Sequence, residues 1–221
     1  MTVTELAHFH SKSGDLTPAL RDLIRWAVDA QDKWCAENLS STTQYMSDGN
    51  EARGVGFDHV HIDFQQIEDP AVVLLTAHWE SVPQHVEWMG SDINKQAIPP
   101  LSEQVDMSKL LIFHVDDVDA ISPEILRAPV VSVSRYLVPK NRKQTVGQSM
   151  KEIYSRDNAR PISKSGWRIE KDEAMERDGV EEHVIVSGAE SIQNLKEIEA
   201  TLFKAVFSGC GQEIRHYKRI F

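Results

Sequence analysis

TAHWESVPQHVEW, residues 76–88, matches VSGAESIQNLKEI, residues 186–198, at an offset that aligns Ser81 with Ser191. Both stretches read as the end of a strand followed by the start of a helix. Ser81 and Gln84 have the S-x-x-Q spacing of a capping box, which satisfies free backbone N–H groups at a helix start. The same strand-to-helix junction therefore occurs twice, which indicates two copies of one structural unit.

The elements around each junction follow the same order. Alternating apolar residues predict strands, and apolar residues at helical spacing predict helices. In the first half we expect a strand at 3–10, a helix from Thr17 through Cys35, strands at 57–66 and 71–79, a helix after Ser81 and a strand at 109–116. In the second half we expect strands at 130–138, 166–172, 182–189 and 213–221, with helices at 143–156 and 192–207. Both halves read as βαββαβ.

The seam between the halves is DDVDAISPEILRAP, residues 116–129, which holds three Asp and two Pro. We therefore divide the chain into a first repeat at 1–116, a linker at 117–129 and a second repeat at 130–221. A βαββαβ unit forms a ferredoxin-like sheet with both helices on one face. The other face needs cover, so we expect an α+β protein whose two ferredoxin-like repeats pack as a pseudodimeric α+β barrel.

Composition limits the classes of partner. The formal charge of −10, from 34 acidic and 24 basic side chains, disfavours nucleic acid. No stretch is apolar for long enough to span a bilayer, and the N-terminus has no secretory pattern, so we expect a cytoplasmic protein without a membrane partner. The two cysteines, Cys35 and Cys210, suit a reducing compartment. The sequence leaves homodimer formation open.

Residues 67–106, IEDPAVVLLTAHWESVPQHVEWMGSDINKQAIPPLSEQVD, carry a family resemblance. They resemble the strand-helix segment of the antibiotic-biosynthesis monooxygenase (ABM) branch of the dimeric α+β barrel superfamily. The resemblance implies a cavity in which an aromatic or polyketide-like substrate of secondary metabolism is oxidised or rearranged without flavin, haem or metal. It also implies that Trp79 borders that cavity. We accordingly expect no cofactor.

Strand alternation proposes catalytic residues for such a cavity. If Val60, Ile62 and Phe64 face the helices, then His59, His61 and Asp63 face the cavity. Histidine can remove a proton at neutral pH, and a nearby carboxylate can orient its ring. We therefore predict these three as catalytic residues. The H-x-H pair with Asp63 or His8 could also hold iron, but this spacing alone is a weak signal, and we predict no metal.

The same alternation proposes substrate-binding residues. On strand 3–10, Val3, Ala7 and Phe9 should face the helices, which leaves His8 and His10 on the cavity side. In the second half, Val131, Val133 and Leu137 should face the helices, which leaves Ser134 and Tyr136 on the cavity side. Trp79 should face the cavity together with Leu75 and Ala77. We predict His8, His10, Trp79 and Tyr136 as substrate contacts.

These patterns favour a cofactor-independent monooxygenase-like enzyme for an aromatic or polyketide-type molecule. Several members of the family place an Asn near the conserved Trp, whereas this chain has Leu75 and Thr76. Two alternatives therefore stay open. One is a non-oxidative cyclase, decarboxylase, dehydratase or isomerase that uses the same cavity, and the other is a non-catalytic binding protein. No GxGxxG, P-loop, HExxH or GxSxG pattern supports a nucleotide, zinc-protease or hydrolase reading.

Overall fold

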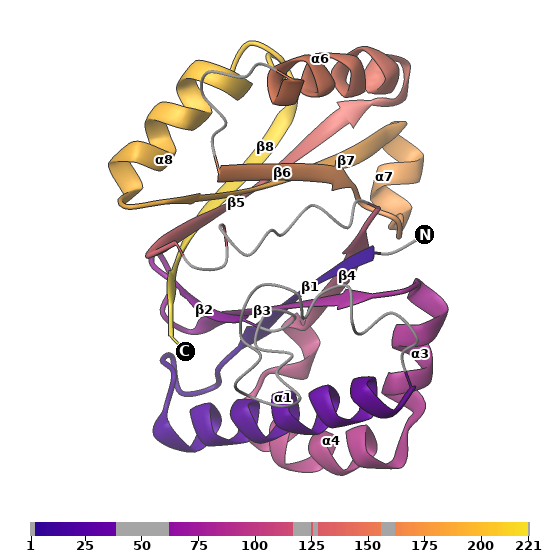
Figure 1. The fold of residues 1–221 in the computed structure, drawn as a ribbon, viewed down its shortest axis with the longest axis vertical. Helices are drawn as coiled ribbons and strands as arrows, with labels where there is room; N and C mark the ends of the chain where they lie inside the picture. Colours follow the sequence, from indigo (N-terminus) through magenta and orange to yellow (C-terminus); the bar gives the residue numbers. More distant parts are fainter. Residues whose placement is uncertain (1–2, 39–61, 117–124, 126–127, 156–161, 221) are drawn as a thin grey trace. The chain divides into compact units, whose positions relative to one another are not determined.

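The computed structural model describes residues 3–38, 62–116, 125, 128–155 and 162–220. The chain divides into two compact units (Figure 1). The first comprises Met1–Ile112 with Ile220–Phe221, and the second comprises Phe113–Arg219. Residues 117–124 and 126–127, most of the expected linker, lie outside the described residues.

The first unit has the order βαββαβ, with an extra helix. Its elements are β1 (Val3–His10), α1 (Pro18–Asn38), β2 (Ile62–Gln66), β3 (Val72–Trp79), α3 (Val82–Gly90), α4 (Asp92–Gln104), the 3₁₀ turn η2 (Met107–Lys109) and β4 (Leu111–Val115), whose last three residues belong to the second unit. The sheet order is β4-β1-β3-β2. β3 pairs antiparallel with β1 and with β2.

The second unit repeats this order with small additions. Its elements are β5 (Val130–Pro139), the 3₁₀ turn η4 (Lys140–Arg142), α6 (Lys143–Ser155), β6 (Ile162–Trp167), α7 (Glu173–Asp178), β7 (Val180–Ala189), α8 (Ile192–Ile198), the π-turn η5 (Glu199–Phe203) and β8 (Gly211–Arg219). The sheet order β8-β5-β7-β6 corresponds strand by strand to that of the first unit. The α+β class and the duplicated βαββαβ order are thus confirmed.

Both strand-to-helix junctions are capped as their sequences predict. The Ser81 hydroxyl accepts from the backbone N–H of Gln84 at 3.4 Å, and the Gln84 side chain accepts from the Glu80 N–H at 3.0 Å. The Ser191 hydroxyl accepts from the Asn194 N–H at 3.2 Å. Each cap satisfies N–H groups that a helix start leaves free, which fixes where α3 and α8 begin.

The predicted sides of the sheet are right for β1 and wrong for β2, β3 and β5. Phe9 packs with the cluster that α1 contributes to the core, so its face of β1 meets the helices as expected. Trp79 also faces the helices, because its ring stacks on His85 of α3, although we expected it on the opposite face. Phe64 pairs with Leu74, which also pairs with His8, so Phe64 lies on the face away from the helices.

β5 is reversed as well. Tyr136 packs against Val146 and Met150 of α6, so Tyr136 faces the helices and not the opposite side of the sheet. The opposite side of β5 carries Arg135, which forms ion pairs with Glu182 and Glu213. Alternation establishes which residues share a face, but a strand with apolar residues on both sides does not reveal which face the helices cover.

Candidate functional site

The three predicted catalytic residues lie at or beyond the edge of the residues that the structure describes. His59 and His61 lie outside the described residues. Asp63 belongs to β2 and pairs with Leu75 of β3, but its side chain is also outside the description. Their catalytic role stays a prediction, and so does the iron alternative that used them. Among the residues with described side chains, no group of three His, Cys, Asp or Glu could hold a metal ion.

The predicted substrate contacts of the first unit lie in two environments. His8 and His10 are half-buried on β1, where they pair with Leu74 and Val72. Trp79 is 1% exposed, and its Nε1 donates a hydrogen bond of 2.7 Å to the carboxylate of Glu5. The same carboxylate lies 3.4 Å from Nε2 of His85, whose ring stacks on Trp79 at 4.6 Å. Trp79 is therefore a core residue that holds a buried carboxylate.

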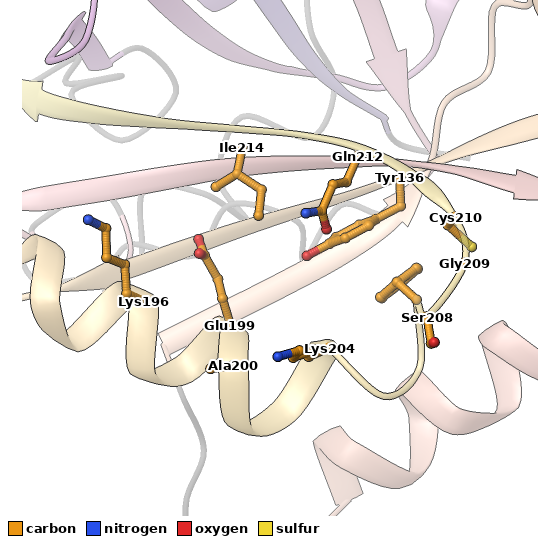
Figure 2. A pocket seen from close by; sticks show the side chains of 11 residues that line it. Tyr136, Lys196, Glu199, Ala200, Lys204, Ser208, Gly209, Cys210, Gln212 and Ile214 are labelled. Atoms are coloured by element: carbon orange, nitrogen blue, oxygen red, sulfur yellow. The ribbon is translucent and has the colours of Figure 1, made fainter.

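A pocket opens in the second unit between its last helical segment and β8 (Figure 2). Its volume is about 490 Å³, within the range of roughly 300–1,000 Å³ that small-molecule sites occupy. Phe207, Ala200 and Ile214 give it apolar walls. Its polar lining comes from α8 and η5, from the loop after η5 and from the two strands: Lys196, Glu199, Lys204, Ser208, Cys210, Gln212 and Tyr136.

Glu199 is the carboxylate of this pocket. It begins the π-turn η5, in which the Lys204 N–H bonds to the Glu199 carbonyl at 3.0 Å. Burial raises the pKa of Glu199, while nearby His216 and the hydroxyls of Ser132 and Ser134 partly oppose that rise. Its Oε1 lies 3.4 Å from the Ser134 hydroxyl, which donates to it, and 4.0 Å from His216 Nε2. π-Turns within helices occur frequently at functional sites.

Tyr136 supplies the opposite wall. Its ring stacks on Phe207, with centroids 3.9 Å apart and planes inclined by 15°. Burial raises the pKa of Tyr136 to about 12, and the nearby Glu199 adds to the rise. The phenol thus stays protonated at neutral pH and can donate a hydrogen bond. Figure 2 shows the Tyr136 hydroxyl and the Glu199 carboxylate projecting into the same space.

Arg142 holds the loop that closes one end of the pocket. Its guanidinium donates to the backbone carbonyls of Val206 at 2.9 Å and Ser208 at 2.8 Å. Gly209 adopts a φ of 77°, a left-handed conformation that favours glycine. The Cys210 sulfur lies 3.5 Å from the Arg142 guanidinium and is not part of a disulfide. The loop is therefore fixed by bonds to its backbone.

Glu199 was not among the predicted site residues, although the sequence around it carries a signal. Leu195 and Phe203, four residues before and after Glu199, are both fully buried. An acidic residue at that spacing lies on the core-facing stripe of a helix, where a solvated carboxylate would not be expected. Tyr136 was predicted as a substrate contact and lines this pocket, but it reaches the pocket from the helix-covered face of β5.

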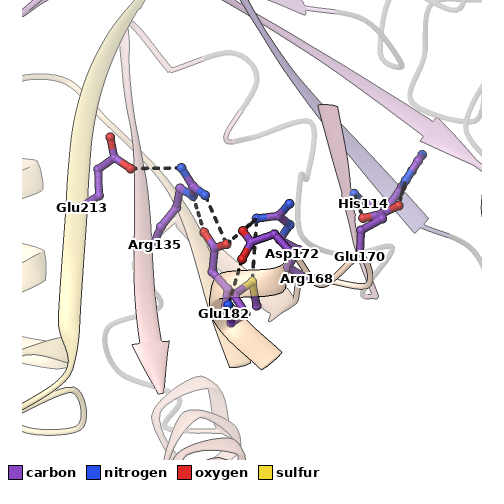
Figure 3. A network of polar contacts seen from close by, with 8 residues as sticks. His114, Arg135, Arg168, Glu170, Asp172, Glu182 and Glu213 are labelled. Atoms are coloured by element: carbon purple, nitrogen blue, oxygen red, sulfur yellow. Dashed lines mark hydrogen bonds and ion pairs between the residues drawn. The ribbon is translucent and has the colours of Figure 1, made fainter. Parts of the chain in front are cut away.

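An ionic network occupies the other face of the second unit (Figure 3). Glu182, with its side chain 2% exposed, pairs with both Arg135 and Arg168. The two guanidiniums lie 5.2 and 5.0 Å from the ring centre of Phe113, within cation–π range. Glu213 and Asp172 pair with the outer sides of Arg135 and Arg168. Because each guanidinium already has carboxylate partners, the network is a structural element of this face.

Comparison with solved structures places the fold. The chain is similar to a "putative monooxygenase" from Lactobacillus acidophilus (TM-score 0.57, 8% identity, 99% of this chain and 93% of that one). It is similar to a "putative monooxygenase" from Fusobacterium nucleatum (TM-score 0.57, 9% identity, 100% of this chain and 93% of that one). It is also similar to an "anthrone oxidase-like protein" (TM-score 0.53, 12% identity, 100% of this chain and 92% of that one). At these identities the likeness establishes a shared fold over both halves.

The sequence itself matches no family model and no curated protein. In the described part of the chain, no helix is long and apolar enough to cross a membrane.

Proposed function

We propose that the chain is a cofactor-independent monooxygenase-like enzyme for an aromatic or polyketide-type small molecule of secondary metabolism, with its active site in the pocket of the second unit. The observation that carries this proposal is a partly buried carboxylate with a raised pKa, Glu199, inside a cavity of ligand size. A base whose pKa is raised toward the working pH is suited to removing a proton from a carbon or phenol acid. The apolar walls suit the body of such a substrate.

The chemistry begins with a proton transfer to Glu199. A substrate CH₂ group activated by an adjacent ring or carbonyl loses this proton, and the resulting carbanion gives an electron to O₂. The two radicals combine and take the proton back as a hydroperoxide. Loss of water with the second C–H proton then leaves a carbonyl, so one O₂ converts CH₂ into C=O and water. The Tyr136 hydroxyl, kept protonated, can donate to the developing oxyanion.

The fold likeness to proteins described as monooxygenases and as anthrone oxidase-like supports this choice of reaction class. The same proton abstraction would also begin a cyclisation or an isomerisation. Oxygen consumption separates these outcomes, because only the oxygenase uses one O₂ for each product formed.

An oxygen electrode, with anthrone and 1-naphthol as probes, tests the proposal. We expect Glu199→Gln to lower turnover by about 10²- to 10⁴-fold, the usual contribution of a general base. Glu197→Gln is the matched control, since Glu197 is exposed on α8 and does not line the pocket. Product without oxygen uptake would reassign the enzyme to the non-oxidative class, and equal turnover in both variants would remove Glu199 from the mechanism.

A further inference from the structure

We infer that the pocket of the second unit selects an aromatic substrate that carries a carboxylate, and that Lys196 and Lys204 bind this carboxylate. The inference rests on the proposed function for the role of Glu199, which must remain available to accept a proton. Binding of the carboxylate can nevertheless be measured without turnover.

The charge of the lining is the first observation. Its basic side chains, Lys196 and Lys204, outnumber its acidic one, Glu199. The chain as a whole has the opposite balance, with a net charge of −10. A locally positive cavity in an acidic protein attracts anions to that cavity and repels them elsewhere.

The second observation is how the lysines of this unit are paired. Lys140 forms an ion pair with Glu176 at 2.8 Å, Lys171 forms one with Glu181 at 3.2 Å, and Lys143 also pairs with Glu181. Within the described residues, neither Lys196 nor Lys204 has a carboxylate within 4.0 Å, and Lys196 acts on the Glu199 carboxylate only from a longer distance. The two ammonium groups at the pocket are therefore available to a ligand, whereas three others in the same unit already have carboxylate partners.

The arrangement along the helix is the third observation. Lys196, Glu199 and Lys204 all line the pocket from one side, with Glu199 between the two lysines in Figure 2. Phe207 and Ile214 line the same pocket, so the ring of a substrate whose carboxylate is held by either ammonium group has apolar walls to pack against. The reactive position would then lie near the Glu199 carboxylate. The substrate anion and the catalytic base thus take separate positions.

The magnitude expected of such contacts is modest. Both lysines are exposed, so salt and water screen their attraction for an anion. Two contacts of this kind give a preference of about 5- to 20-fold for a carboxylate over its neutral parent at low ionic strength. Raising the salt concentration to about 0.5 M should remove most of it.

Calorimetric titration of the full chain with 1-hydroxy-2-naphthoate and with 1-naphthol tests the inference, since the two probes differ only in the carboxylate. We expect the naphthoate to bind more tightly, and the double variant Lys196→Gln/Lys204→Gln to lose that preference. The control is Lys151→Gln/Lys218→Gln, which removes the same charge from exposed positions outside the pocket. The control should keep the preference.

Each result bears on one of the two proposals. Equal binding of the probes, no binding of either, or a preference that survives in Lys196→Gln/Lys204→Gln would overturn the carboxylate inference. A lysine-dependent preference without any turnover would support the inference and leave the oxygenase proposal to fail on its own test. Turnover of 1-naphthol that depends on Glu199, with no preference for the naphthoate, would support the oxygenase proposal and overturn the carboxylate inference.

Discussion

Tyr136 and His183 lie directly opposite each other across the β5–β7 ladder, on the face of the sheet that the helices cover. Tyr136 reaches the pocket, whereas His183 is 2% exposed behind it. The His183 ring is nearly perpendicular to that of Trp167, with centroids 4.6 Å apart, and its centroid lies 5.3 Å from that of Phe207. Burial among these rings lowers the pKa of His183 to about 3, so the imidazole is neutral at physiological pH.

His183 should therefore make stability depend on pH. Its pKa is about 3 in the folded chain, against the ordinary histidine value of 6.5 in the unfolded chain, so the unfolded chain binds the extra proton between these values. Its contribution is fully present above pH 6.5 and is lost as the pH falls toward 3. The slope for one proton is about 1.4 kcal/mol per pH unit. Urea unfolding at about pH 7.5, 6.5, 5.5 and 4.5 measures it.

His183→Phe is the comparison for this measurement, because it fills similar space and cannot titrate. The difference in unfolding free energy between wild type and variant should shift in favour of the variant as the pH falls. Other groups with shifted pKa values, such as Glu170 and Glu181, titrate in both proteins and cancel in the difference. A difference that stays constant over this range would show that His183 does not titrate as described.

Glu199 should have the opposite dependence. Burial raises its pKa above the ordinary 4.5, so the folded chain holds the proton more tightly than the unfolded chain. Its contribution to stability is present below pH 4.5 and is lost as the pH rises through the raised value. Glu199→Gln should therefore gain stability relative to wild type on moving from about pH 4 to about pH 7. Thermal unfolding at both pH values checks this, and a gain that is equal at both would contradict it.

The order of elements could be predicted from the sequence because it depends on local patterns. The Ser81 and Ser191 caps and the alternating strands are set by neighbours along the chain, and they fixed βαββαβ in both halves. The structure differs from the prediction where tertiary packing determines the local secondary structure. The helix expected at 192–207 gives way to a π-turn at Glu199–Phe203, and the short helix Glu173–Asp178 was not expected.

The candidate site was harder to predict because it depends on which face the helices cover. His8 and Tyr136 were both predicted on the cavity side of their strands. His8 does lie on the face away from the helices of its unit, whereas Tyr136 lies on the face that the helices of its unit cover. The spacing to Leu195 and Phe203 marks Glu199 as a core-facing carboxylate, but its neighbours His216 and Ser134 come from distant parts of the sequence and are known only from the fold. No local sequence pattern predicts these contacts.

The ionic network on the face of the second unit away from its helices predicts that loss of a buried carboxylate costs far more stability than loss of an exposed one. Glu182→Ala leaves the guanidiniums of Arg135 and Arg168 without their buried partner and should cost about 3–5 kcal/mol. Glu213→Ala removes a carboxylate that is 45% exposed and should cost less than about 1 kcal/mol. Chemical denaturation of both variants makes the comparison. Equal losses would mean that Glu182 is as well solvated as Glu213.

Gly188 predicts a steric effect that no sequence pattern reveals. A Cβ added at Gly188 would lie 2.8 Å from the Cβ of Ala128 and 3.1 Å from the backbone Cα of Ile125. Real Cβ atoms essentially never approach within 3.0 Å, as the contact with Ala128 would require, and the Ile125 backbone at 3.1 Å cannot rotate away as a long side chain can. Gly188→Ala should therefore destabilise the second unit by about 1–3 kcal/mol through overpacking.

Gly147→Ala is the matched control, because it makes the same chemical change in α6, where an added Cβ meets nothing within 4 Å. It should stabilise the chain by about 0.5–1 kcal/mol, since alanine is the better helix former. Adding Ala128→Gly to Gly188→Ala should recover only part of the loss, because the Ile125 backbone still blocks the new methyl group. Urea unfolding of the three variants tests this order, and a Gly188→Ala protein as stable as wild type would show that Ile125 and Ala128 move aside at no cost.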